Sequence, residues 1–308
     1  MKKIGLALGS GGARGWAHVG VIEALQEANL QIDFVAGTSM GALVGAAFAA
    51  GQLDLLREAS LRLDWKQVLY YFLEVGFPRS GLVDGSKIVT FLRHHIGRTA
   101  IESLRLPYAA VATDVLTGKE VVMRSGDLLD AIRASISIPG IFTPVRRGPA
   151  TLVDGGVVNP LPVSVLREMG ADFVIAVDVN YGAVGTGRKK ELKAVRRIHI
   201  PAQKNRLLQR ISDQVDRFDS SVLSPARRWL AGGDLPNIFD VIGNSVIIMQ
   251  ARITEMRLEI EPADLLIRPG GDVGYMEFHR AAEAIQMGYM AAKEALKSMP
   301  SPDRLFRR

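Results

Sequence analysis

Ser39 is flanked by two glycines, with Gly37 two residues before it and Gly41 two residues after it. In such a G-x-S-x-G pattern the serine occupies a sharp turn from a strand to a helix, where flanking side chains would clash. The surroundings agree, because residues 34–36 have strand character and residues 42–47 are small and apolar, as in a helix packed on a sheet. We predict that Ser39 is a nucleophile; a tight turn without chemistry is the alternative.

A nucleophilic serine needs a base, which is most often a histidine. None of the five histidines has the setting expected of such a base, which would follow a late strand. They are His18, His94, His95, His199 and His279. His18 lies in the first predicted helix beside a glycine loop, so we predict a structural role for it.

Asp154 is a better candidate for the base. It ends the apolar run 151–153 and is followed by Gly155 and Gly156, which leave its carboxylate free to approach a serine. An aspartate has an ordinary pKa of about 3.9, so this role requires burial, which makes a carboxylate more basic. We predict Asp154 as the base; a structural Asp-Gly turn is the alternative.

A second glycine-rich turn, residues 9–15, joins the first predicted strand to the first predicted helix. Side chains are absent or small at Gly11, Gly12 and Ala13, so their N–H groups are predicted to form an oxyanion hole. The turn lacks the G-K-S or G-K-T ending of a P-loop, and Arg14 replaces the last glycine of the dinucleotide pattern. Nucleotide binding is therefore the weaker alternative.

The composition limits the classes of protein. The chain has 308 residues, 48% of them hydrophobic, and no cysteine. It can bury a large core, and it can form neither disulfides nor thiolate metal sites. The longest run of small and apolar residues, 36–51, is shorter than the roughly 20 residues that span a bilayer. We therefore expect no membrane-spanning helix and a cytoplasmic protein.

The positive charge is concentrated in one segment, Arg188–Arg210. This segment holds nine lysines and arginines and one acid, whereas the whole chain has a net charge of only +6. A local basic segment favours contact with an anionic membrane surface over binding of nucleic acid by the whole protein. A solvated loop is the alternative.

Short apolar runs alternate with helical patterns, which predicts an α/β fold with a mostly parallel sheet covered by helices on both faces. The predicted strands are Ile4–Leu8, Asp33–Ala36, Tyr108–Thr113, Thr151–Val153 and Phe173–Val179. The predicted helices are Arg14–Ala28, Met40–Ala50, Gly85–Ile96, Asp127–Ser135 and Pro162–Met169. These elements place Ser39, Asp154 and the glycine turn at junctions next to strand ends.

Two regions interrupt this regularity within what we predict to be one domain, residues 1–308. Residues 64–83 are rich in aromatics and form either a cap over an apolar pocket or ordinary core. Residues 181–236 are basic and polar, and predict a flexible insertion. A last helix, residues 277–297, is predicted to pack back on the sheet.

Together these motifs resemble the patatin-like phospholipase family, in its bacterial branch related to the catalytic domain of neuropathy target esterase. Residues 10–15 resemble the family pattern G-G-G-x-R-G, including Arg14 and Gly15, with Ser10 in place of the first glycine. Residues 37–41 and 154–156 resemble its G-x-S-x-G and D-G-G motifs. Residues 112–118 and 134–140 also look like the family and are expected to form the framework of the site.

The resemblance implies a Ser39–Asp154 dyad that cleaves fatty-acyl esters of phospholipids, lysophospholipids or related lipids, without a metal or cofactor. It implies a lipid ester as the binding partner, with no nucleic acid, and leaves a homodimer open. The segment 188–210 is expected to make any peripheral contact with an anionic membrane. The alternative is a lipid-responsive regulatory protein with little turnover.

Overall fold

The computed structural model describes residues 2–72, 84–96, 99–182 and 238–299. The chain divides into two compact units, Met1–Val184 together with Val246–Arg308, and Gly185–Ser245. The sheet and the candidate site belong to the first unit. Nearly all of the predicted insertion at 181–236, with its basic segment Arg188–Arg210, lies outside the described residues. The division into one domain and an insertion therefore stays a prediction.

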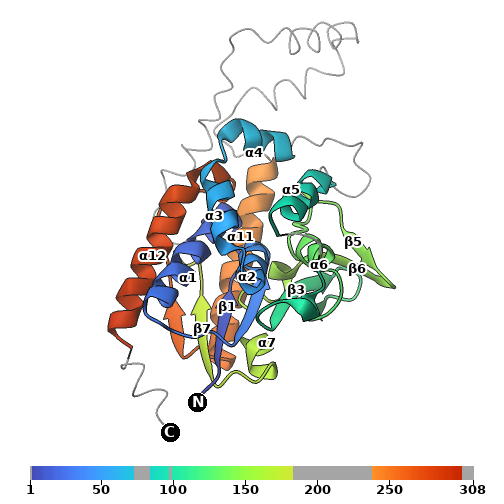
Figure 1. Cartoon of the computed structure of the whole chain (residues 1–308). Helices are drawn as coiled ribbons and strands as arrows, with labels where there is room; N and C mark the ends of the chain where they lie inside the picture. Colours follow the sequence, from blue (N-terminus) through green and yellow to red (C-terminus); the bar gives the residue numbers. More distant parts are fainter. Residues whose placement is uncertain (1, 73–83, 97–98, 183–237, 300–308) are drawn as a thin grey trace, which may run out of the picture. The chain divides into compact units, whose positions relative to one another are not determined.

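The first unit is built on an eight-stranded mixed sheet (Figure 1). Its strand order is β5-β6-β3-β2-β1-β7-β8, and β4 pairs with β3 off this path. The strands are β1 Ile4–Leu8, β2 Phe34–Thr38, β3 Tyr108–Asp114, β4 Lys119–Met123, β5 Val145–Arg147, β6 Ala150–Asp154, β7 Phe173–Val177 and β8 Leu265–Ile267. Five neighbouring strands are parallel, in the order β3, β2, β1, β7 and β8. The pairs β3–β4, β3–β6 and β5–β6 are antiparallel.

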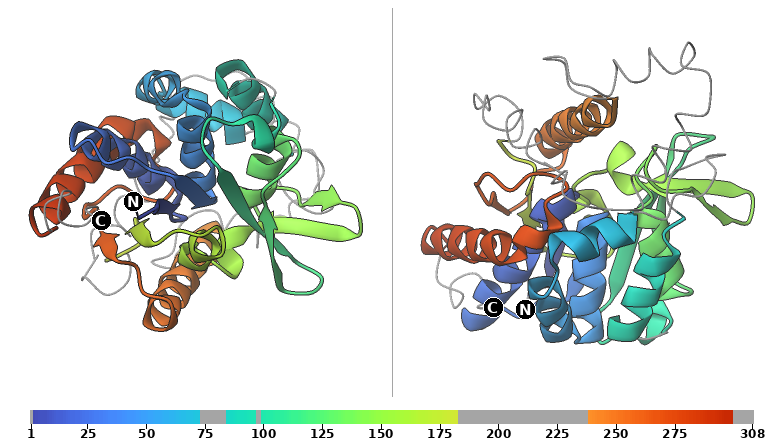
Figure 2. Two further views of the ribbon diagram at one scale, coloured as in Figure 1. Left: turned by 60° about the horizontal axis from the view of Figure 1, so that its bottom comes forward. Right: turned by 90° about the horizontal axis from the view of Figure 1, so that it is seen from above.

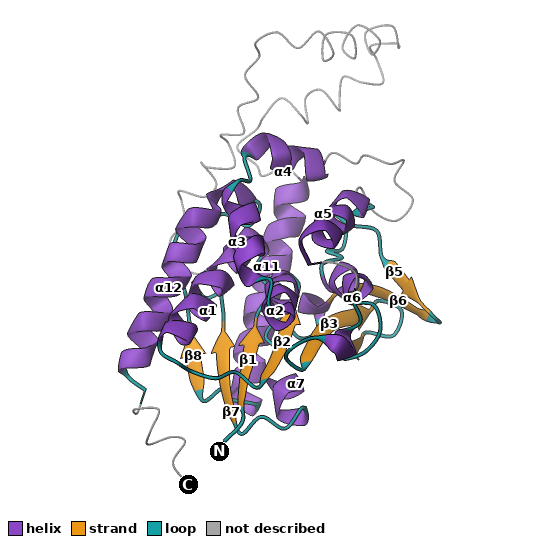
Figure 3. Cartoon of the chain, in the orientation of Figure 1, coloured by secondary structure: helices purple, strands orange, loops and turns teal. Residues whose placement is uncertain are grey.

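Helices follow most of the parallel strands (Figure 3). They are α1 Ala17–Glu27, α2 Met40–Ala50, α3 Leu53–Leu61, α4 Trp65–Phe72, α5 Ser86–Ile96, α6 Leu128–Ser135, α7 Val163–Glu168, α11 Ile238–Ile260 and α12 Ala281–Lys297. Short 3-10 helices are η1 Gly12–Trp16, η2 Ile101–Ser103, η3 Gly155–Val157 and η4 Phe278–Arg280.

The alternation of side chains along the strands separates two buried layers. Leu6 and Leu8 of β1 belong to a large cluster with residues of α1, α2 and α12, whereas Ala7 belongs to a second cluster with residues of α7. Leu258 of α11 packs against this second cluster. Figure 2 shows α1, α2 and α12 on one side of the central strands and α7 and α11 on the other. Both faces of the sheet are thus covered, because successive side chains of a strand point in opposite directions.

The predicted α/β fold is confirmed, with a mostly parallel core. The first helix begins later than predicted, at Ala17, because Gly12–Trp16 forms a 3-10 turn. The last helix likewise begins at Ala281 and buries Ala284 and Ile285. The sequence did not predict α3, α4, β4, β5, β8 or α11.

The aromatic region is only partly described. Residues 65–72 form α4, and residues 73–83 lie outside the described residues. Trp65 is 56% exposed, so it does not belong to the core. Within the described ranges, none of the helices has the length and apolar character needed to cross a bilayer.

Candidate active site

Ser39 stands at the junction of β2 and α2 in a strained backbone conformation, with φ 56° and ψ −122°. Few non-glycine residues adopt a positive φ, and a nucleophile on a tight strand-to-helix turn is a known case. The turn leaves no room for side chains at its flanks, because a Cβ at Gly41 would lie 2.1 Å from the carbonyl oxygen of Leu8 and one at Gly37 would lie 2.3 Å from the carbonyl oxygen of Gly41. Both glycines of the motif are therefore required by packing.

Hydrogen bonds from the neighbouring strand and helix hold this turn. The N–H of Ser39 donates to Ser135 Oγ at 2.9 Å, and Ser135 Oγ donates to the carbonyl of Val111 at 2.6 Å. Thr38 Oγ1 donates to the carbonyl of Asn159 at 2.8 Å. Ser135 belongs to the stretch 134–140 that we expected to frame the site.

Asp154 reaches the level of Ser39 through the register of the sheet. Thr38 of β2 pairs with Val111 of β3, and the next residue of β3, Ala112, pairs with Asp154 of β6. The N–H of Asp154 donates to the carbonyl of Ser137 at 2.8 Å, and Thr113 Oγ1 donates to the carbonyl of Asp154 at 3.0 Å. Both expected framework stretches, 112–118 and 134–140, thus contact this aspartate.

The carboxyl group of Asp154 is buried and only half satisfied. The residue is 1% exposed, and Oδ1 accepts a hydrogen bond from the N–H of Gly156 at 2.7 Å. Oδ2 has no hydrogen-bond partner among the residues that the structure describes. Burial raises the pKa of Asp154 to about 6, against opposing contributions from the Ser39 hydroxyl and the Gly156 N–H. The carboxyl group is thus more basic than that of an ordinary aspartate, and the hydroxyl of Ser39 is close enough to affect its pKa.

The glycine loop lies against the Ser39 turn, because a Cβ at Gly41 would also come within 2.7 Å of the carbonyl oxygen of Gly9. In the described part of the chain, the N–H groups of Gly11 and Gly12 have no hydrogen-bond acceptor. Ala13, which we predicted as a further oxyanion donor, instead donates its N–H to the carbonyl of Tyr275 at 2.8 Å. Its N–H is therefore committed to holding the loop.

Buried polar side chains from distant parts of the sequence brace this loop. Arg14 Nη1 donates to Asn180 Oδ1 at 3.2 Å, and Asn180 Nδ2 donates to the carbonyl of Ser10 at 3.0 Å. Ser10 Oγ donates to Gln250 Oε1 at 2.9 Å, and Asn180 Nδ2 lies 3.2 Å from the same oxygen. Ser10, which departs from the family pattern, therefore uses its hydroxyl to connect the loop to α11.

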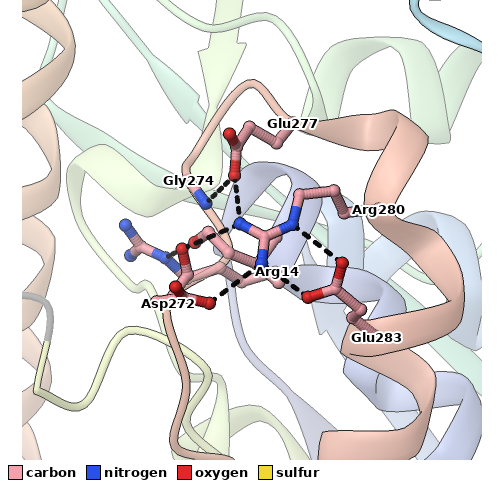
Figure 4. Close-up of polar contacts among 7 residues, drawn as sticks. Arg14, Asp272, Gly274, Glu277, Arg280 and Glu283 are labelled. Atoms are coloured by element: carbon pink, nitrogen blue, oxygen red, sulfur yellow. Dashed lines mark hydrogen bonds and ion pairs between the residues drawn. The ribbon is translucent and has the colours of Figure 1, made fainter. Parts of the chain in front are cut away.

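The loop between β8 and η4 supplies the other support (Figure 4). Arg14 Nε donates to the carbonyl of Val273 at 3.0 Å. Arg280 anchors the same segment by pairing with Asp272 at 2.9 Å and Glu277 at 2.7 Å. These ion pairs are partly exposed, so they contribute little to the stability of the protein, and we infer that their main effect is to fix the conformation of the loop.

His18 is not available as a base. Its Nε2 lies 2.8 Å from the carbonyl oxygen of Gly9, which can only accept, so Nε2 carries the proton. Burial lowers the pKa of His18 to about 4, against a raising contribution from Gly9. The ring is therefore neutral at pH 7 and holds the start of the glycine loop, as predicted from its position.

Three residues near the site were not found from the sequence: Asn180, Gln250 and Tyr275. Each is an isolated polar residue in a region without a motif, and its contact with the loop arises only from the tertiary fold. Tyr275 is buried with Ile138, Phe142 and Ile247 in a separate apolar cluster. Burial raises the pKa of Tyr275, and the carboxylate of Asp154 raises it further.

Comparisons with known proteins identify the family of the chain. Residues 6–167 match the family model for patatin-like phospholipase. An uncharacterized NTE family protein of Mycobacterium tuberculosis is 35% identical over 98% of this chain and 93% of its own length. A second one from the same species is 32% identical over 97% of this chain and 47% of its own length.

More distant proteins match too. Patatin-like phospholipase domain-containing protein 6 of Mus musculus is 36% identical over 57% of this chain and 13% of its own length. The crystal structure of VipD from Legionella pneumophila is similar with a TM-score of 0.43 and 14% identity, over 96% of this chain and 67% of that one, a likeness too weak to carry an argument. Since the family model covers more than half of the chain and a mycobacterial relative aligns along nearly all of it, the chain belongs to the patatin-like phospholipase family, a family of lipid ester hydrolases.

Proposed function

We propose that this chain is a phospholipase A or lysophospholipase type of serine hydrolase, which cleaves fatty-acyl esters with a Ser39–Asp154 dyad. The observation that carries the proposal is the buried Oδ2 of Asp154, which has no partner among the described residues and belongs to a carboxyl whose pKa is raised to about 6. A buried, unsatisfied carboxylate destabilises a fold, so its presence beside a serine in a strained turn supports a catalytic role.

In the proposed mechanism, Ser39 Oγ attacks the carbonyl carbon of the ester while Asp154 Oδ2 takes the hydroxyl proton. The N–H groups of Gly11 and Gly12 stabilise the oxyanion, and the positive end of α2 favours the same charge. The leaving alcohol or lysolipid takes the proton from Asp154. Water then releases the fatty acid and restores Ser39.

The lipid-ester substrate is supported by the family to which the chain belongs. Residues 188–210 lie outside the described residues, so their contact with an anionic membrane remains a proposal about how the enzyme reaches its substrate. A homodimer remains a separate proposal.

The test is turnover of a panel of lipid esters by Ser39→Ala and Asp154→Asn, measured as fatty acid released from phosphatidylcholine, lysophosphatidylcholine and monoacylglycerol. Each substitution is expected to lower kcat by at least about 10³-fold, because each removes a group that acts in the transition state. Asp154→Asn with substantial activity would contradict the dyad.

The pH dependence of stability separates folding from catalysis in this test. The folded pKa of Asp154 is raised, so its contribution to stability is present below about pH 4 and is lost as the pH rises through about 6. Asp154→Asn has no such loss. Relative to the natural protein, it is expected to gain on the order of 3 kcal/mol of stability between about pH 4 and a pH above 6. Thermal or urea unfolding at both pH values checks this.

A further inference from the structure

Gln250 is a buried residue of α11 that the proposed mechanism leaves without a role. It is 1% exposed, and its Oε1 accepts from Ser10 Oγ and lies within hydrogen-bonding distance of Asn180 Nδ2. Its Nε2 is buried and has no hydrogen-bond partner within the described ranges. One end of this amide is therefore fully engaged, and the other end is not.

The orientation of this amide follows from its neighbours. Arg14 can only donate, so the oxygen of Asn180 must face it, and Nδ2 of Asn180 must face the carbonyl of Ser10, which can only accept. The same Nδ2 faces Gln250, so Gln250 must present its oxygen there. The chain of contacts thus fixes Nε2 of Gln250 on the side away from Asn180.

That side is the side of the catalytic carboxylate. A Cβ at Gly156 would lie 2.3 Å from Nε2 of Gln250 and 3.0 Å from Oδ1 of Asp154. The amide donor of Gln250 and the carboxyl group of Asp154, through its Oδ1, therefore both lie next to Gly156. Buried donors are almost always satisfied in folded proteins, so a donor held in this position is expected to bind an oxygen during the working cycle.

We propose that Gln250 Nε2 positions the water that hydrolyses the acyl-enzyme, an inference that rests on the proposed function. The water oxygen accepts from Nε2 while Asp154 takes one of its protons, and its lone pair attacks the acyl carbonyl carbon on Ser39. The bond from that carbon to Ser39 Oγ then breaks. Asp154 returns the proton to Oγ, and the fatty acid leaves. A water held by one donor and one acceptor keeps the orientation that the attack requires.

Gln250 also braces Ser10, so the test must separate water positioning from support of the loop. Gln250→Met removes both ends of the amide. Gln250→Glu keeps an acceptor for Ser10 and Asn180 and loses the donor once its carboxyl is ionised; because burial raises the pKa of a carboxyl, this variant is measured at alkaline pH. Ser10→Ala removes only the hydroxyl contacts with Gln250 and Asn180. A p-nitrophenyl fatty ester is used as substrate, with stopped-flow measurement of the acylation burst and of the later steady state. Intact mass measures the fraction of Ser39 that carries the acyl group.

Both Gln250 variants are expected to accumulate acylated Ser39, with deacylation slowed by roughly tenfold or more and a burst rate close to that of Ser10→Ala. If Gln250→Met does not fold, as judged by its thermal transition, Gln250→Glu alone decides the outcome. An equal fall of burst and steady-state rates in the Gln250 variants would overturn the inference and leave Gln250 as a brace. If the natural protein does not hydrolyse the ester and neither it nor any variant acquires an acyl group on Ser39, the proposed function fails as well.

Discussion

The turn that carries Ser39 and the glycine loop after β1 both join a parallel strand to a helix, but they are held in different ways. The Ser39 turn is fixed by its own glycines and by Val111 and Ser135 on neighbouring elements. The glycine loop depends on side chains and carbonyls far along the sequence. These are Asn180, Gln250, Val273 and Tyr275.

This difference shows which parts of an active site leave a signal in the sequence. A turn held by its own steric requirements needs particular residues at fixed spacing, so it forms a motif. A loop braced by distant partners can be held by many polar residues, so only its glycines form a motif. Substitutions in the two turns should therefore have different effects on stability and catalysis.

The largest effect is expected from Gly41→Ala in the Ser39 turn. The new Cβ would lie 2.1 Å from the carbonyl oxygen of Leu8, and backbone atoms of a central strand cannot withdraw. We expect activity to fall by at least about 10³-fold and the thermal transition to drop, because overpacking distorts the sheet as well as the turn. Gly270→Ala is the control, since nothing lies within 4 Å of its Cβ. Wild-type activity in Gly41→Ala would show that the turn is less constrained than its geometry indicates.

A smaller effect, confined to catalysis, is expected from Arg14→Met in the glycine loop. Its guanidinium joins Asn180 to Val273, so its loss should leave Gly11 and Gly12 less well placed for an oxyanion. We expect kcat to fall by about 10–100-fold with little change in KM, which is somewhat less than the loss of a direct donor. Steady-state kinetics on one ester measure both constants. An equal effect on binding and turnover would indicate damage to the fold of the loop.

The fold could be predicted where neighbouring residues in the sequence form a recognisable pattern. Apolar runs and glycine spacing predicted the first strand, the helix after Ser39, and Ser39 and Asp154 as candidate catalytic residues. The direction of β6 does not, because an antiparallel strand reached through β5 has the same composition as a parallel one. Even so, the register of β6 with β3 brings Asp154 to the level of Ser39.

The supports of the glycine loop were not predictable, because they depend on which distant residues the fold brings together. Asn180 and Gln250 are ordinary polar residues in the sequence, and only their shared burial beside Ser10 shows what they contact. The sequence likewise could not show that the N–H of Ala13 is unavailable for an oxyanion, because its acceptor is the carbonyl of Tyr275, far along the chain.

The most direct test of the dyad is labelling by a fluorophosphonate between about pH 4 and pH 9, followed by intact mass and peptide mapping. We expect one adduct, on Ser39, which Ser39→Ala lacks. Its rate of formation should fall as the pH drops below about 6, because protonation of Asp154 removes the base. Asp154→Asn should label slowly at every pH. Labelling of Asp154→Asn at the rate of the natural protein, or an adduct on another residue, would contradict the account.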